Sequence, residues 1–353
     1  MCRLSQVGLY ICLFLFLTCA IGAQPRSGWD RVKPRGSGPG ITYIHFSSDQ
    51  NGLIAGDDGF IRYTHDGGDN WYAPSHPRLS SGQFNEDIVA GSRRGEIYYL
   101  LTDLHLLKSQ SNGESWEIME RPTSPDLFRN SQAQGLIVEY YDVSFANDDE
   151  GWVLCGILKK GKPRDTFLQS YLLHTDDAGE SWRSTRLTPG RLMVRMHFAD
   201  RSQGWIVGKE GTILYTNNGG ENFVQQAVPV WTGAKASGSR PKLMDVDFKG
   251  KKGIVVGTLG TILRTDDGGR SWILMPQPSL KSRYFVRVQM LDDKSAWVVG
   301  ESGIILSTAT GGKFWMQEGN STTTNLYALF MKNRRHGWAA GDDQTLLEYN
   351  RTR

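Results

Sequence analysis

Charged and hydroxylated side chains stand at the start of short apolar segments that recur along the chain. Aligned with one another, these segments begin with Tyr43, Glu86, Asp142, Arg195, Asp245, Arg287 and Tyr327. A second polar side chain follows two positions later as His45, His197, Asp247 or Gln289. Apolar strands rarely carry ionised groups without partners or water. If the fold gathers these residues, they would form either a structural ion-pair network or a binding site for a polar ligand, and both interpretations stay open.

Each of these segments opens a repeated unit. It ends in a large residue, as in Asp142-Val-Ser-Phe145, and an apolar strand between small residues follows, as in Gly204-Trp-Ile-Val-Gly208. A third strand then leads into a turn of Thr or Ser, Asp, Asn and Gly, which an aromatic residue closes. Asp and Asn bond the backbone two residues on, and Gly adopts positive φ, so each turn is predicted to join two strands tightly. The turns lie at 64–71, 109–116, 175–182, 216–223, 265–272 and 308–315.

Four strands per unit, repeated about every 40 to 50 residues, are typical of a β-propeller blade. Residues 26–32 look like the end of a unit without its beginning, and residues 341–349 like a beginning without its end. Joining the two would close the ring and remove open sheet edges. We therefore predict an all-β, seven-bladed propeller of four-stranded antiparallel blades. Residues 24–353 would form it as one domain, with the N-terminal strand completing the C-terminal blade.

The turn aspartates Asp66, Asp177 and Asp267 recur because every blade needs its turn, so we interpret them as structural. Blade two has Ser111 at this position, which leaves its register open by a residue or two. Cys155 is the one cysteine beyond residue 23, so neither an internal disulfide nor a thiol metal cluster is expected. No cofactor or metal is predicted. The aromatic residues of the turns are interpreted as packing residues: Trp71, Trp116, Trp182, Trp272 and Trp315.

The first 23 residues differ from the rest of the chain. One arginine precedes the apolar run 7–17, and small residues fill 18–23, which indicates a secretory signal cut after Gly22 or Ala23. An uncleaved membrane anchor and a lipidated Cys19 are the alternatives, although the run is short for a membrane span. The mature chain is expected in a periplasm, a thylakoid lumen or outside the cell. A net charge of +3 lacks the basic footprint of a nucleic-acid-binding protein, and we expect a monomer with a protein partner.

Three segments exceed the minimal repeat: 121–141, 158–165 and 230–242. In a four-stranded antiparallel blade, connections of these kinds emerge on the face where the innermost strands begin, whereas the Asp-Gly turns emerge on the opposite face. Loops that outgrow a fold often carry its function. The elaborated face is therefore the predicted working surface, with tolerated insertions as the alternative.

The unit Gly-x-x-Gly-x-Ile-x-x-Thr-x-Asp-Gly-Gly-x-x-Trp, preceded by Gly-Trp-x-Val-Gly, resembles the repeat of the photosystem II stability and assembly factor family. The match is best at 208–223 and 257–272 and extends over nearly the whole chain after the signal. The resemblance implies a non-enzymatic propeller that binds a membrane-protein assembly intermediate on the exported side. It also implies an arginine-rich binding patch, for which Arg195 and Arg287, then Arg191 and Arg183, are the candidates. The signal has no Ser-rich plastid segment, so another envelope complex is an open alternative for the partner.

A glycoside hydrolase is the competing hypothesis, because the Asp-Gly turn also resembles the Asp-box of sialidases. Such enzymes need arginines on the substrate carboxylate, a tyrosine nucleophile with a glutamate partner, and an acid/base aspartate. A Phe-Arg-Ile-Pro segment typical of sialidases is missing, and only two arginines stand in the predicted ring. A carbohydrate-binding surface propeller would need an exposed aromatic platform, for which Trp231 is the loop candidate. The hydrolytic roles would fall to Tyr43, Glu86, Asp142, Arg195 and Arg287.

Overall fold

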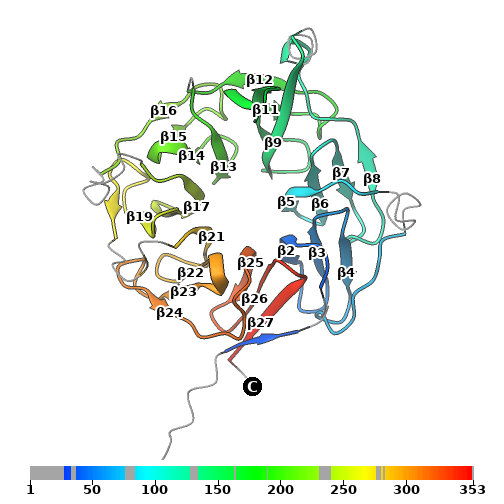
Figure 1. Ribbon diagram of the computed structural model, residues 1–353, viewed down its shortest axis with the longest axis vertical. Helices are drawn as coiled ribbons and strands as arrows, with labels where there is room; N and C mark the ends of the chain where they lie inside the picture. The colour runs from blue at the N-terminus through cyan, green and yellow to red at the C-terminus, as the bar shows by residue number, and fades with distance from the viewer. Residues whose placement is uncertain are drawn as a thin grey trace, which may run out of the picture.

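The computed structural model describes residues 28–32, 37–75, 84–127, 134–162, 164–188, 190–229, 240–275, 280 and 283–351. These residues form seven antiparallel sheets arranged in a ring (Figure 1). The prediction of an all-β, seven-bladed propeller is confirmed. We number the sheets as blades one to seven in chain order.

Each blade is built from the ring axis outward. The innermost strands are β2 (Ile41–Phe46), β5 (Ile88–Arg94), β9 (Leu136–Phe145), β13 (Met193–Phe198), β17 (Leu243–Lys249), β21 (Phe285–Met290) and β25 (Leu326–Asn333). The second strands are β3 (Gly52–Gly56), β6 (Ile97–Thr102), β10 (Gly151–Lys159), β14 (Gly204–Gly208), β18 (Lys252–Gly257), β22 (Ala296–Gly300) and β26 (His336–Gly341).

The third strands are β4 (Ile61–Thr64), β7 (Leu106–Ser109), β11 (Thr166–Thr175), β15 (Ile213–Thr216), β19 (Thr261–Thr265), β23 (Ile305–Thr308) and β27 (Thr345–Asn350). The outer strands are β8 (Glu117–Met119), β12 (Arg183–Arg186), β16 (Val224–Gln225), β20 (Ile273–Leu274), β24 (Met316–Gln317) and, in blade seven, β1 (Trp29–Arg31). Single 3-10 turns, η1 (Lys209–Gly211) and η3 (Glu301–Gly303), join the second and third strands of blades four and six.

The N-terminal strand closes the ring, as the sequence predicted. β1 pairs antiparallel with β27, and Trp29 lies opposite Tyr349. Their ring centroids are 5.0 Å apart, and both side chains are buried. The first and last strands of the propeller therefore share one sheet, which removes the open edge that a linear array would expose.

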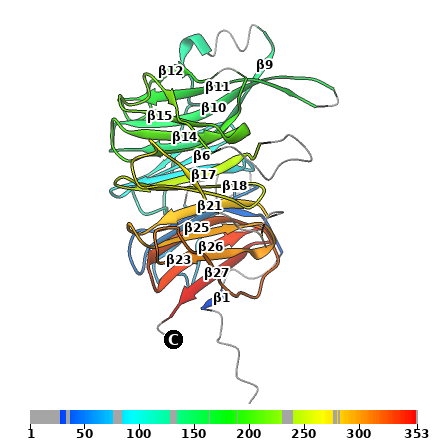
Figure 2. The same cartoon turned by 90° about the vertical axis from the view of Figure 1, so that its left-hand side faces the viewer.

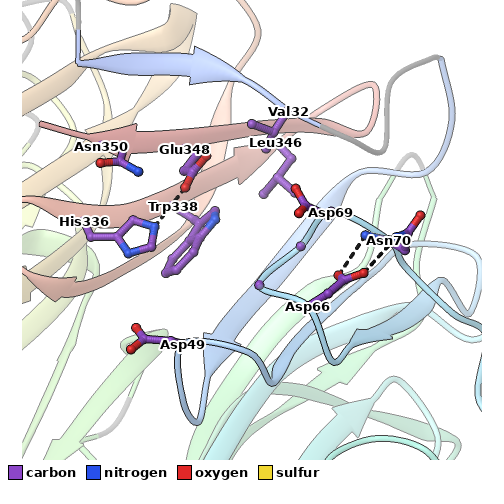
Figure 3. A pocket seen from close by; sticks show the side chains of 12 residues that line it. Val32, Asp49, Asp66, Asp69, Asn70, His336, Trp338, Leu346, Glu348 and Asn350 are labelled. Atoms are coloured by element: carbon purple, nitrogen blue, oxygen red, sulfur yellow. Dashed lines mark hydrogen bonds and ion pairs between the residues drawn. The ribbon is translucent and has the colours of Figure 1, made fainter. Parts of the chain in front are cut away.

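The expectation of a fourth strand in every blade is wrong for blade one. Beyond its turn only one bridge forms, between Tyr63 and Tyr72. Pro74 follows two residues later and has no N–H to continue a ladder. A hollow of about 500 Å³ opens between this blade and blade seven. Three of its carboxylates are already engaged, since Asp49 pairs with Lys332, Glu348 accepts from His336 and Asp66 accepts from Asn70 (Figure 3).

Aromatic stacking joins neighbouring blades. At four junctions, the residue that ends an innermost strand stacks on an aromatic ring of the preceding blade. Centroid distances of 3.6 to 3.8 Å describe the pairs Phe46 with Trp338, Phe145 with Tyr99, Phe198 with Trp152 and Phe248 with Trp205. Such stacks contribute about 0.5–1.5 kcal/mol beyond the area that they bury.

The Asp-Gly turns share one hydrogen-bond pattern. The side chain at the aspartate position accepts the backbone N–H of the residue four positions later, at 2.9 to 3.1 Å in six turns. In blades two and six, hydroxyl groups of Ser111 and Thr310 take this role. Hydrogen bonds lower the pKa of Asp66, Asp177 and Asp267 to about 2. Each of these aspartates thus holds its own turn.

The two faces of the ring differ. We call the face where the innermost strands begin the mouth face, and the opposite one the turn face. Blade three has unusually long strands, with ten residues in β9, nine in β10 and ten in β11. Their paired ends project beyond the ring (Figure 2). Of the described parts of the extra segments, 134–141, 158–162 and 164–165 therefore lie on the mouth face, whereas 128–133, 163 and 230–239 are outside the described residues.

We expect Asp267→Ala to lower the stability of the chain by about 1 kcal/mol, because it leaves the Ser271 N–H and the Thr265 hydroxyl without their acceptor. Asp267→Ser should cost less, since Ser111 shows that a hydroxyl can accept the same N–H. Denaturant midpoints of both variants would check this. Equal midpoints for wild type and Asp267→Ala would contradict a structural role.

Candidate functional site

A pocket of about 240 Å³ lies at the ring axis toward the mouth face. Five of the seven residues predicted to begin the innermost strands line it, together with His197 from the second polar position. We call these five the mouth cluster: Tyr43, Asp142, Arg195, Asp245 and Arg287. Each follows a bulge in its innermost strand and stands at the same register position, opposite Ala55, Leu154, Val207, Val256 and Val299, respectively. Bulges re-aim side chains at sheet edges. The repeat thus brings one side chain from each of five blades to one place.

Glu86 and Tyr327 were placed in this ring wrongly. The register position in blades two and seven belongs to Ala90 and Ala328. In most blades a large apolar residue stands three positions after the mouth position, but β5 has Arg93 there, and in β25 that place belongs to Met331 and not to Phe330. Outside the cluster, the Glu86 carboxylate accepts from the Thr102 hydroxyl at 2.6 Å. The Tyr327 hydroxyl donates to Asp342 at 3.1 Å.

The side chains of Arg195 and Asp142 form hydrogen bonds that stabilise the fold. The Arg195 Nη1 atom donates to the Tyr141 carbonyl at 2.8 Å and to Asp142 at 3.0 Å. The other oxygen of Asp142 accepts the Met196 N–H at 2.8 Å. Arginine and carboxylate together therefore connect blade three to blade four.

Asp245 has a similar structural bond, because it accepts the Val288 N–H of blade six at 2.8 Å. Burial raises its pKa to about 6, although Arg287 and Arg195 act in the opposite direction. Its charge is consequently sensitive to mildly acidic pH.

Arg287 and Tyr43 are less engaged. Among the described residues, the Arg287 guanidinium forms no ion pair, and its hydrogen bond goes to the Val286 carbonyl at 3.1 Å. Burial, with Arg195 close by, lowers its pKa to about 10. The buried Tyr43 hydroxyl oxygen has no hydrogen-bond partner within the described structure, and burial raises its pKa. One arginine and one phenol of the cluster thus retain free hydrogen-bonding capacity.

The second layer of polar residues connects blades. His197 lies 3.1 Å from Asp247, which accepts the Met290 N–H at 2.6 Å. Gln289 bonds both backbone groups of Met331 in the next blade. The pKa of His45 falls to about 3 because the ring is buried, so it is neutral at physiological pH. His197, Asp247 and Gln289 therefore form polar contacts between blades, whereas the buried His45 Nδ1 has no hydrogen-bond partner within the described structure.

The structure does not bring Arg191 or Arg183 into the cluster. Arg191 precedes β13 on the mouth face and bonds Thr212 at 3.1 Å, with Glu210 3.6 Å away. Arg183 belongs to the outer strand β12 and pairs with Asp176 at 2.9 Å. The arginine patch expected from the resemblance is therefore reduced to Arg195 and Arg287.

The sialidase-like set is not assembled either. Glu86 would have to assist Tyr43, but its carboxylate lies 2.8 Å from His105 instead. Trp231, the candidate for a carbohydrate platform, lies outside the described residues, as does the predicted signal. Within the described part of the chain, no group of three or more His, Cys, Asp or Glu residues is arranged to hold a metal ion, and no helix there has the length and apolarity to cross a membrane.

Sequence reasoning missed several residues that line the pocket. Thr42, Ser92 and Ser144 supply hydroxyl groups, and Gly91 supplies space. A Cβ atom at Gly91 would stand 2.6 Å from the Tyr43 ring, so the ring lies directly against β5. A glycine inside a strand often marks such a close approach, and this was the available signal.

Comparison with known proteins identifies a family with a similar repeat. Residues 187–280 and 275–350 match the family model described as "Photosynthesis system II assembly factor YCF48". The chloroplastic photosystem II stability/assembly factor HCF136 of Oryza sativa subsp. japonica is 30% identical over 137 residues. That alignment covers 37% of this chain and 28% of the relative, well under two thirds of its length.

Two solved structures share the fold across nearly the whole chain. YCF48 bound to D1 peptide superposes with a TM-score of 0.67 and 15% identity, covering 93% of this chain and 96% of that one. YCF48 from Cyanidioschyzon merolae gives 0.68 and 16%, covering 92% and 99%. Through residues 187–350 the chain is therefore similar to the photosystem II assembly factor YCF48 family, and it shares the seven-bladed fold of YCF48.

Proposed function

We propose that this chain is an exported, non-enzymatic assembly factor that binds a segment of a membrane-protein complex over the mouth cluster. The family match and the relative HCF136, named for photosystem II assembly, support the class of function. The structure of YCF48 bound to D1 peptide supports a polypeptide as the ligand. Export rests on residues 1–23, which read as a secretory signal and lie outside the described residues.

One observation carries the assignment of the site. Arg287 lines a pocket of about 240 Å³ and has no carboxylate at ion-pair distance among the described residues, although Asp245 and Asp142 act on its charge from further away. Tyr43 lines the same pocket, and its hydroxyl has no hydrogen-bond partner there. A buried guanidinium that no carboxylate contacts directly is costly to the fold, so such a group is retained where a ligand supplies the contacting anion. Guanidinium and carboxylate match as bidentate partners. The client segment would therefore place a carboxylate against Arg287.

The other members of the cluster limit what can bind. Asp142 and Asp245 carry negative charge into the same pocket, which disfavours polyanions such as nucleic acids. Arg195 is occupied by Asp142 and the Tyr141 carbonyl, and would shape the pocket more than it contacts the client. A polypeptide with an isolated acidic group suits this balance of charges.

Affinity capture from the membranes of the chain's own host tests the proposal. Wild type should recover one membrane complex, and mass spectrometry would decide between photosystem II and another envelope complex. Arg287→Gln should lower recovery about 10- to 100-fold, the effect of losing a hydrogen-bonded charge pair. Arg191→Gln, on the same face but outside the pocket, is the matched control. Equal recovery by wild type and a folded Arg287→Gln variant would refute the site.

Client binding should also strengthen as the pH falls from roughly 7 toward roughly 5. The pKa of Asp245 is raised to about 6, so this carboxyl gains a proton across that interval and the pocket loses a negative charge. Asp245→Asn should bind more tightly than wild type at neutral pH, and its affinity should change little over the same interval. Affinities measured by titration at both pH values would check this. A wild-type pH profile retained in Asp245→Asn would show that another group is responsible.

A further inference from the structure

Blade three carries a feature that the pocket does not use. Beyond Leu154, which lies opposite Asp142, β10 continues for five residues to Lys159 and stays paired with β9 on one side and β11 on the other. At about 3.3 Å per residue, this three-stranded ribbon reaches roughly 15 Å past the mouth cluster. Figure 2 shows the paired ends of β10 and β11 standing clear of the ring.

The ribbon is built as a firm element. Arg121 donates to the Val138 carbonyl at 2.9 Å and to the Tyr140 hydroxyl at 3.1 Å. Gln169 donates to the carbonyls of Ser170 and Leu187, both at 2.8 Å. These bonds link β9 to Arg121 and β11 to the Leu187 carbonyl, and they restrain the orientation of the ribbon.

The end of the ribbon is basic. Its exposed cationic side chains are Lys159, Lys160, Lys162 and Arg164, and none of them forms an ion pair within the described residues. The one acidic residue there, Asp165, accepts the Gly161 N–H at 3.0 Å and so helps to form the turn. Positive charge is therefore concentrated at the end of a ribbon that projects from the mouth face.

Apolar side chains stand directly behind these charges. Leu168 is the extra residue of a bulge in β11 and is 40% exposed, while Leu158 and Phe167 are half-buried. Cationic groups gathered at a projecting tip suit an anionic membrane surface, which attracts basic side chains by charge. A convex projection has no concave walls to enclose a peptide, in contrast to the pocket at the ring axis.

We propose that this ribbon docks the protein on an anionic membrane surface. Lys159, Lys160, Lys162 and Arg164 contact lipid headgroups, whereas Leu168, behind them on the ribbon, stays on the protein side of the headgroups. The mouth cluster lies on the same face, so docking would turn its pocket toward the membrane. The ribbon and the pocket are separate sites, and neither requires the other to be correct.

Flotation of the full chain with lipid vesicles tests the proposal. Wild type should bind vesicles of phosphatidylcholine mixed with phosphatidylglycerol more strongly than vesicles of phosphatidylcholine alone, and added salt should weaken the difference. Lys159→Glu/Lys160→Glu should lower partitioning onto the anionic vesicles by on the order of tenfold or more. Leu168→Ser should leave partitioning within about twofold of wild type, because the contact is made by charge at the tip.

The matched control is Lys249→Glu/Lys251→Glu, which makes the same charge change in an exposed hairpin on the turn face. It should bind the anionic vesicles within about twofold of wild type, since surface charges act only within a Debye length. The apolar run at 7–17 is common to every variant, so its contribution cancels in the comparison.

Equal binding to both kinds of vesicle, or equal loss in the two double variants, would overturn the proposal. Loss of binding to a glutamate-rich peptide in Lys159→Glu/Lys160→Glu, without loss on vesicles, would also overturn it and assign the ribbon to a protein partner. Client capture through Arg287 should persist in Lys159→Glu/Lys160→Glu when the client is offered in detergent. The two proposals therefore fail independently.

Discussion

The ring depends on the contact between the innermost strand of one blade and the next blade. A blade cannot bury both of its faces alone, and here the junctions combine stacked rings with hydrogen bonds. Phe198 lies on Trp152 at 3.8 Å, and at the same junction Asp142 accepts the Met196 N–H at 2.8 Å. The stack supplies buried area, whereas the carboxylate fixes the offset between the two strands.

This contact explains why charged residues occur in strands that are otherwise apolar. Asp142, Asp245 and Asp247 each accept a backbone N–H from the following blade. The two interpretations left open by the sequence, an ion-pair network and a binding site, therefore apply to different members of one set. Residues with every polar atom engaged maintain the ring. Arg287 and Tyr43 can each form further hydrogen bonds, and these two side chains therefore define the candidate site.

The sequence predicted the parts of the fold that repeat. A turn with the same hydrogen bonds appears in blade after blade, so number of blades, strand order and closure could all be read from spacing. The prediction from the sequence was wrong where one blade departs from the repeat. Blade two has Arg93 opposite Tyr98, where blade three has Phe145 opposite Gly151. The large apolar residue that marks the end of the innermost strand is therefore missing, and the sequence wrongly predicted Glu86 at the mouth position that Ala90 holds. Spacing also could not distinguish Arg195 from Arg287. Arg195 bonds the Tyr141 carbonyl of the preceding blade, whereas Arg287 bonds the Val286 carbonyl of its own strand.

The two faces of the propeller differ for the same physical reason. On the turn face, each connection is fixed by a side chain that must accept one particular N–H, as Asp267 does from Ser271 at 2.9 Å. Such turns have little freedom to change in length or charge. On the mouth face, the short connections share backbone hydrogen bonds instead, as from the Thr212 N–H to the Lys209 carbonyl and from the Ile304 N–H to the Glu301 carbonyl. These bonds require no particular side chain, and blade three extends a ribbon where blades four and six make a single turn. A repeat that fixes one face through required side chains, and the other through backbone bonds alone, leaves more freedom in sequence on the second face, where both the pocket and the ribbon are found.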